Sequence, residues 1–293
     1  MIYTIFNDCL SVKVESLGAQ LCSIVSAEGT EYLWQRDKKY WADASPLLFP
    51  YIARLYGGGY TYLGQRYSMG IHGFAAQCEF VAEDISRQSV TLVLRENDGT
   101  LEQYPFRFRL SVTYSLCGFA LQVSYRVENL DGKAMPFAIG GHPGFNVPLS
   151  DGTEFEDYYL SFDEPCAAKR VGFSDELFLS GEDRLYPLED GRIIKLSHSL
   201  FDDDAIILKD TAKSLTLACT KTKKRLTISF PGFDYFGIWH MPHTDAPYVC
   251  LEPWTSLPSR QGVVEELSEK SDMIMLGCGE KYEAQWTVSI SEG

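Results

Sequence analysis

A histidine lies in a stretch rich in glycine and proline near the middle of the chain. His142 falls within residues 140–148, GGHPGFNVP, and no other side chain of this stretch is charged. The glycines allow close approaches of the backbone, and each proline fixes φ and removes a hydrogen-bond donor. An imidazole exchanges a proton near neutral pH. The stretch therefore predicts either a rigidly held general acid or base, or a structural histidine in a turn.

A glutamate ends an apolar run in the last fifth of the chain. Glu252 follows residues 248–251, YVCL, and is followed by Pro253 and Trp254. Desolvation of a carboxylate at such a strand end raises its pKa and its basicity. The indole offers a flat surface for a sugar ring, although core packing is its commoner use. With His142, Glu252 predicts a general acid and base that need no cofactor, and a salt-bridged strand end is the alternative for Glu252.

Two further polar residues occur in irregular stretches before residue 80. Arg54 follows residues 45–53, SPLLFPYIA, and His72 lies between Gly70 and Gly73. A guanidinium presents a planar set of donors that suits sugar hydroxyls or carboxylates. Both side chains are candidates for binding substrate oxygen atoms. The alternatives are an ion pair that holds a loop for Arg54 and a hydrogen-bonded structural role for His72.

Other chemistries find less support in the sequence. The chain has no GxSxG nucleophile elbow and no glycine-rich phosphate loop between a strand and a helix. Its eight cysteines are spread singly, without CxxC pairs, which predicts free thiols and argues against a zinc site. His240 and His243 have i, i+3 spacing, but Pro242 prevents a regular helix and no third ligand is evident nearby. A metal pair there is a minor alternative, and we expect no cofactor.

The elements that must position these residues are predicted to be short strands. Alternation of apolar and polar residues, the signal of a half-buried strand, recurs along the chain. The segments are residues 10–14, 20–25, 89–94, 106–114, 119–127, 157–162, 193–196, 205–208, 214–218, 225–230 and 282–290. The fourth and fifth of them predict a long hairpin. Only residues 38–41 and 200–204 favour brief helices. This pattern predicts an all-β fold of large antiparallel sheets packed as a sandwich, with few short helices.

Composition limits the classes of partner. Hydrophobic residues make up 45% of the chain and charged residues 23%, as in a globular protein, and no linker divides residues 1–293, so we expect a single domain. The net charge of −14 argues against nucleic acid and anionic membranes as partners. The first eight residues lack the pattern of a secretory signal, and no run is long enough to span a bilayer. We expect a soluble, cytoplasmic protein, either a monomer or a homodimer, that acts on a small molecule.

Four stretches together resemble the aldose 1-epimerase (galactose mutarotase-like) family, and more closely its LacX-related branch. The matching motifs are Phe49-Pro50 with Arg54, His72-Gly73-Phe74, Gly141-His142-Pro143-Gly144-Phe145-Asn146 and Leu251-Glu252-Pro253-Trp254. Their order and spacing span most of the chain. The resemblance implies a β-supersandwich and interconversion of the α and β anomers of a free hexose such as galactose or glucose.

The same resemblance implies a role for each site residue. Glu252 would be the general base that removes the proton of the C1 hydroxyl, and His142 the general acid that protonates the ring oxygen. The ring opens to the aldehyde, the C1–C2 bond rotates, and reclosure gives the other anomer. Arg54 and His72 would bind sugar oxygens. No metal or nicotinamide is implied, because the acid and the base are reset after each turnover.

The resemblance also implies an aspartate in the sugar site. Residues 202–204 are three successive aspartates. We favour Asp204, because the strand at 205–208 begins beside it, and Asp202 is the alternative. Three adjacent carboxylates are also typical of a solvated turn. The galactose mutarotases usually have Asn before the first histidine motif, whereas Gly70-Ile71 precedes His72 here. This departure leaves the preferred sugar open.

Two other functions compete with a mutarotase of free sugars. A hexose-6-phosphate mutarotase needs a basic phosphate pocket, for which Arg66, Arg260 or the cluster at 221–225 are candidates. The net charge of −14 argues against a phosphorylated substrate. A non-catalytic carbohydrate-binding or sensor protein would keep the pocket without turnover. Retention of both the candidate acid and the candidate base argues against that alternative.

Overall fold

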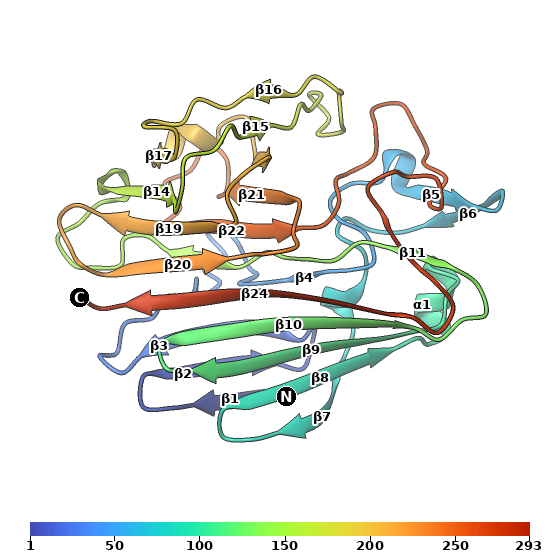
Figure 1. The fold of residues 1–293 in the computed structure, drawn as a ribbon, viewed down its shortest axis with the longest axis horizontal. Helices are drawn as coiled ribbons and strands as arrows, with labels where there is room; N and C mark the ends of the chain where they lie inside the picture. The colour runs from blue at the N-terminus through green and yellow to red at the C-terminus, as the bar shows by residue number, and fades with distance from the viewer.

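The computed structural model describes residues 1–293, and its largest element is a nine-stranded antiparallel sheet (Figure 1). In spatial order this sheet contains β17 (Ile193–Lys195), β14 (Tyr158–Phe162), β19 (Ser214–Cys219), β20 (Arg225–Ser229), β24 (Lys281–Ser291), β10 (Ala120–Asn129), β9 (Phe108–Cys117), β8 (Ser89–Arg95) and β7 (Val81–Ile85). The predicted hairpin is confirmed, because β9 pairs with β10 from Cys117 and Ala120 at the turn to Phe108 and Asn129 at the open end. Every second residue of β10 is buried, as expected for a strand with one face on the core.

A second large sheet of eight strands carries the residues that matter for chemistry. Its strands are β16 (Arg184–Leu185), β15 (Lys169–Arg170), β18 (Ile206–Lys209), β21 (Tyr235–Trp239), β22 (Tyr248–Trp254), β12 (Gly140–Gly141) and β4 (Leu47–Leu48), and β13 (Gly144–Asn146) also pairs with β22. All seven residues of β22 are buried. Strand β22 therefore lies inside the molecule, and its polar residues are removed from bulk water.

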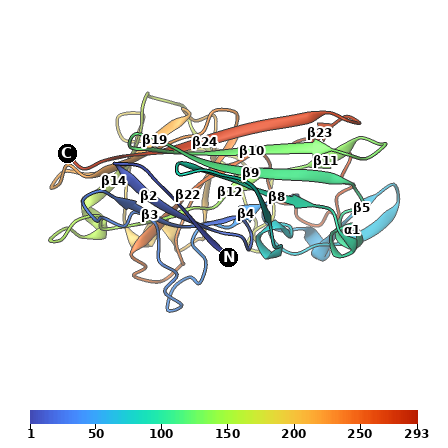
Figure 2. The same ribbon diagram turned by 90° about the horizontal axis from the view of Figure 1, so that it is seen from below.

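Smaller elements complete the molecule. They are the three-stranded sheet of β1 (Ile2–Phe6), β2 (Leu10–Glu15) and β3 (Gln20–Ser26), the pairs β5 (Gly59–Tyr62) with β6 (Gln65–Ser68) and β11 (Met135–Phe137) with β23 (Ile274–Leu276), the helix α1 (Asp98–Gln103), and 3₁₀ turns at Tyr56–Gly58, Ala75–Gln77, Phe155–Asp157 and His198–Phe201. Figure 2 shows β24, β10 and β9 as one layer over another that contains β2, β3, β4 and β22. One connected cluster of buried hydrophobic side chains draws on both layers. The predicted all-β sandwich is thus confirmed.

Both predicted helices are wrong, in contrast to the predicted hairpin. Residues 38–40 form a turn and Trp41 lies outside any element, so no helix forms there, and the region 200–204 contains only the end of a 3₁₀ turn. The helix α1 was not predicted. It is capped by Asn97, whose Oδ1 accepts from the Thr100 backbone while Thr100 Oγ1 accepts from the Asn97 backbone. Six residues are too few to show a helical period. None of the helices has the length and apolar character that a membrane crossing requires.

Candidate active site

A cavity of about 660 Å³ brings the predicted site residues together. Its lining includes five of them: Arg54, His72, His142, Asp204 and Glu252. These residues come from segments that are far apart in the sequence. Strand pairing explains why His142, Glu252 and Asp204 lie close together. Strand β22 pairs with β12, β13 and β21, and β21 pairs with β18, which begins beside Asp204.

The glycines around His142 are required by close packing. A Cβ at Gly141 would lie 3.0 Å from Tyr125 Oη and 3.3 Å from the Trp286 ring, and one at Gly144 would lie 3.0 Å from Trp41. Side chains at these positions would push the segment away from its neighbours. The glycines thus let the backbone carry His142 to its position between β12 and β13.

His142 and Glu252 face each other inside the cavity wall. The distance from His142 Nε2 to Glu252 Oε2 is 3.3 Å, and the glutamate side chain is 1% exposed. Trp254 Nε1 donates a hydrogen bond of 3.1 Å to the same carboxylate oxygen. His142 Nδ1 is buried and has no hydrogen-bond partner within the protein. The imidazole is therefore held by packing and by one carboxylate, with little else to fix its proton.

Burial shifts the pKa values of this pair in opposite directions. Desolvation raises the pKa of Glu252 well above its usual value; the Trp254 hydrogen bond opposes the shift, and the nearby Asp204 carboxylate adds to it. Desolvation lowers the pKa of His142 well below its usual value, and His72 lowers it further. In both cases the neutral form is favoured, because a low-dielectric site penalises charge. Opposed shifts of two adjacent groups are typical of acid–base sites.

His72 is held in one tautomer at the cavity wall. Its backbone has φ of 63°, a left-handed conformation that is strained for a non-glycine residue. Its Nδ1 accepts a hydrogen bond of 3.1 Å from the Ala53 backbone N–H. Burial, together with the charge of Arg54, lowers the pKa of His72 to about 4. The neutral ring therefore carries its proton on Nε2, which can serve as a hydrogen-bond donor.

Arg54 is exposed, lines the cavity and forms no ion pair. The alternative role of an ion pair that holds a loop thus finds no support. An unpaired guanidinium at a cavity wall keeps its donors free for ligand oxygens.

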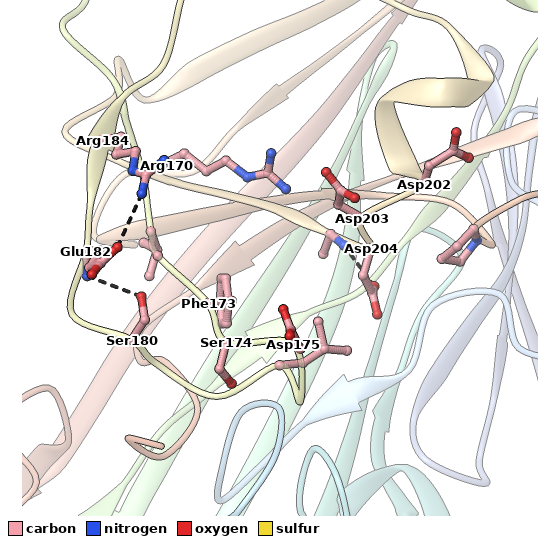
Figure 3. Close-up of a pocket in the computed structure, with 15 residues that line it drawn as sticks. Arg170, Phe173, Ser174, Asp175, Ser180, Glu182, Arg184, Asp202, Asp203 and Asp204 are labelled. Atoms are coloured by element: carbon pink, nitrogen blue, oxygen red, sulfur yellow. Dashed lines mark hydrogen bonds and ion pairs between the residues drawn. The ribbon is translucent and has the colours of Figure 1, made fainter. Parts of the chain in front are cut away.

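The three successive aspartates lie in different surroundings. Asp204 lines the cavity with φ of 71°, and its Oδ1 accepts a hydrogen bond of 2.8 Å from the Ala205 backbone. Asp202 instead lies 3.2 Å from His243 Nδ1. Figure 3 shows the carboxylates of Asp203 and Asp204 pointing to opposite sides of the segment. Among the three, only Asp204 belongs to the cavity that contains His142 and Glu252.

A second cavity of about 780 Å³ adjoins the first (Figure 3). The two share Phe173, Leu177, Asp204 and Ala205 in their walls. Figure 3 shows the Arg170 side chain extending toward the aspartates, whereas Asp175 and Glu182 add acidic groups elsewhere in the lining. The approach to the His142 cavity is therefore polar and predominantly acidic.

Sequence reasoning missed two tryptophans that pack against the His142 ring and against each other. The Trp41 ring lies 5.0 Å from the His142 ring, and the Trp239 ring lies 5.6 Å from it. Both line the cavity. Trp41 is the last residue of the segment 38–41 that was predicted as a helix, and Trp239 ends strand β21. No sequence signal separates a tryptophan at a cavity from one in the core.

The suspected metal pair does not form. His240 Nε2 lies 3.1 Å from His198 Nδ1 and its Nδ1 lies 2.8 Å from the Met241 carbonyl oxygen, whereas His243 contacts Asp202. A different set of possible ligands converges at the cavity instead. Donor atoms of His142, Cys250 and Glu252 lie within 4.8 Å of one another.

Comparisons with known proteins show which proteins the chain resembles. The family profile described as aldose 1-epimerase matches residues 1–289. The plasmid-encoded protein LacX of Lactococcus lactis subsp. lactis is 36% identical over 260 residues, which cover 86% of each chain. A galactose mutarotase related enzyme from Lactobacillus acidophilus has a TM-score of 0.94 and 32% identity, with 99% of this chain and 97% of that chain covered. A galactose mutarotase-like protein from Lactobacillus casei ATCC 334 has a TM-score of 0.93 and 33% identity over 99% of this chain and all of the other. The chain belongs to the aldose 1-epimerase family.

Proposed function

We propose that the protein is a cofactor-independent mutarotase that interconverts the α and β anomers of a free hexose such as galactose or glucose. The observation that carries the proposal is the 3.3 Å contact between His142 Nε2 and Glu252 Oε2 at the wall of a cavity. Opening a hemiacetal requires removal of a proton from O1 and delivery of a proton to the ring oxygen. Two adjacent groups that share one proton can do both.

The opposed pKa shifts suit this chemistry. Burial raises the pKa of Glu252 and lowers that of His142, and the two adjacent groups titrate as a coupled pair between which a proton can pass. The form with the proton on His142 combines a carboxylate base with an imidazolium acid. Glu252 then accepts the O1 proton while His142 protonates the ring oxygen. Rotation about C1–C2 and reclosure with the roles reversed give the other anomer and restore the pair.

The remaining polar groups would hold the sugar between these two residues. His72 would donate from Nε2, Arg54 would donate from its free guanidinium, and Asp204 would accept from a hydroxyl. Trp41 and Trp239 contact each other and supply apolar surface beside His142. Flat aromatic surfaces suit the C–H faces of a pyranose ring.

The electrostatics favour a free sugar over a sugar phosphate. Among the suggested phosphate ligands, Arg66 donates to the Gly57 carbonyl oxygen, Arg260 pairs with Glu265, and Lys221 pairs with Asp157. None of these cations lines the His142 cavity or the adjoining acidic cavity. In the two cavities a dianionic phosphate could reach Arg54, Arg170 and Arg184, but carboxylates outnumber these cations in the walls and would repel it.

Polarimetry on freshly dissolved α-galactose and α-glucose tests the proposal. The protein should accelerate the approach to equilibrium, and the corresponding 6-phosphates should be poorer substrates. A faster reaction with the phosphates would favour the phosphate alternative. Calorimetric binding of a sugar, with rates no better than buffer across a panel of aldoses, would favour the non-catalytic carbohydrate-binding alternative.

A further inference from the structure

We propose that His142, Cys250 and Glu252 form a binding site for a borderline-soft divalent metal ion such as Zn²⁺, and that the bound ion inhibits the protein. The binding of metal stands on the geometry alone. The inhibition rests on the function proposed above, so the two parts are tested separately.

Strand register brings the three side chains together. Cys250 and Glu252 are two residues apart on β22, so they point to the same face of the sheet. His142 lies between β12 and β13, and both of these strands pair with β22, through Gly140 to Trp254 and through Gly144 to Cys250. The imidazole thus lies over the same stretch of β22 from which the thiol and the carboxylate project.

The distances approach those of a metal site. Two ligands of one tetrahedral zinc ion, each bonded at about 2.1 Å, lie about 3.4 Å apart. His142 Nε2 and Glu252 Oε2 are already 3.3 Å apart. Cys250 Sγ lies within 4.8 Å of a ring nitrogen of His142 and of a carboxylate oxygen of Glu252, so a movement of about 1 Å would let it bond the same ion. A fourth position, on the cavity side, would be open to water.

The types of donor select the class of metal. A nitrogen, a thiolate sulfur and a carboxylate oxygen suit Zn²⁺ and Co²⁺, whereas Mg²⁺ and Ca²⁺ require oxygen ligands. The nearby carboxylate of Asp204 adds negative charge that favours a cation. No other cysteine of the chain belongs to a group of three such ligands. Among the eight thiols, Cys250 is therefore the one that should confer metal sensitivity.

Bound metal would occupy the atoms that the proposed reaction uses. Coordination engages the lone pair of His142 Nε2 and a Glu252 oxygen, so neither group could exchange a proton with a sugar. A chelator should reverse the effect, because no covalent bond to carbon is formed or broken.

Cobalt spectroscopy tests the binding without reference to activity. Chelator-treated protein is titrated with Co²⁺, and the wild type should develop the near-ultraviolet absorption of a cobalt–thiolate bond at one ion per chain. Cys250→Ala should lack this band, whereas Cys219→Ala, which removes another buried thiol on β19, should keep it. Equal bands in the wild type and Cys250→Ala, or no band in the wild type, would overturn the site.

A second variant guards against a folding defect. Circular dichroism establishes whether Cys250→Ala is folded, and Glu252→Gln removes a different ligand from the same group. That variant should bind Co²⁺ roughly tenfold or more weakly than the wild type. Unchanged affinity in Glu252→Gln would also count against the site.

The inhibition is tested in the anomerisation assay. Zn²⁺ should lower the rate of the wild type and of Cys219→Ala, and EDTA should restore it, whereas Cys250→Ala should tolerate roughly tenfold more Zn²⁺. Equal sensitivity of all three proteins would refute inhibition through this site. A cobalt band without any anomerisation would refute the proposed mutarotase and leave the metal site standing. Anomerisation without a cobalt band would refute the metal site and leave the proposed mutarotase standing.

Discussion

Two buried histidines of this protein differ in how their ring nitrogens are satisfied. Both lie among aromatic rings, and burial lowers the pKa of both. In His240, one nitrogen contacts the Met241 carbonyl oxygen at 2.8 Å and the other contacts His198 at 3.1 Å. In His142, Nδ1 has no partner and Nε2 faces Glu252 at the wall of a cavity. A histidine with both nitrogens paired stabilises a fold, whereas one with a free nitrogen beside a cavity remains available for chemistry.

The largest expected effect is on activity at the His142 cluster. His142→Asn and Glu252→Gln should each lower kcat/KM for anomerisation by roughly 10²- to 10⁴-fold, because each removes one of the two proton-transfer groups. Both variants should stay folded, since the shapes of the side chains are nearly kept. Polarimetry gives the rates and circular dichroism the fold. His243→Asn is the matched control: this exposed histidine contacts Asp202 and should be dispensable. A comparable loss of kcat/KM in His243→Asn would mean that the effect is not specific to the His142 cluster.

The converse experiment targets the satisfied histidine. His240→Ala should lower the free energy of unfolding by roughly 2–4 kcal/mol, because it leaves a cavity and removes the partner of His198. The activity per folded molecule should change far less than in the His142 variant. Urea unfolding and polarimetry on the same preparations provide the comparison. A stable but inactive His240→Ala protein would show that this cluster, too, serves catalysis.

A smaller effect should follow from removing the donor that orients Glu252. Trp254→Phe keeps an aromatic ring but deletes the N–H that bonds to Oε2, and it should lower kcat by roughly tenfold with a smaller change in KM. Loss of this donor should also raise the pKa of Glu252 further, so the alkaline limb of the pH–rate profile should move to higher pH. A reduced rate with an unmoved profile would mean that Trp254 acts through packing alone.

The smallest expected effect is a change in how stability depends on pH. The pKa of His240 falls from 6.5 when unfolded to about 4 when folded, so the unfolded chain binds protons first as the pH drops. Stability from this residue is full above pH 6.5 and is lost between pH 6.5 and 4. Between pH 7 and 5, His240→Ala should therefore lose about 2 kcal/mol less stability than the wild type in urea unfolding. Parallel losses would contradict the lowered pKa.

Much of the fold could be predicted from local patterns, and the site could be predicted only in part. Alternation in segments such as β9 and β10 reports burial on one face directly, so the strands and their hairpin were predictable. Turns at 38–41 and the six-residue α1 carry no comparable period. His142 and Glu252 stand out because glycine, proline and tryptophan surround them.

The sequence gives no signal for which side chains on different strands lie close together. The proximity of Cys250 to the His142 pair depends on register between β13 and β22, and the packing of Trp41 and Trp239 against His142 depends on tertiary structure. The same is true of the partner of His240, which is His198 rather than His243. Spacing along the chain could not predict these neighbours, because each lies on a separate element.

The central claim is that His142 and Glu252 act as one unit on a sugar. Exchange NMR between the two anomers of galactose or glucose measures this directly, with buffer, wild type, both single variants and His142→Asn/Glu252→Gln. We predict that the wild type accelerates exchange and that the double variant falls to the same residual rate as either single variant, because residues that act together lose their effect together. Exchange at the buffer rate with the wild type, or losses that multiply in the double variant, would contradict the account.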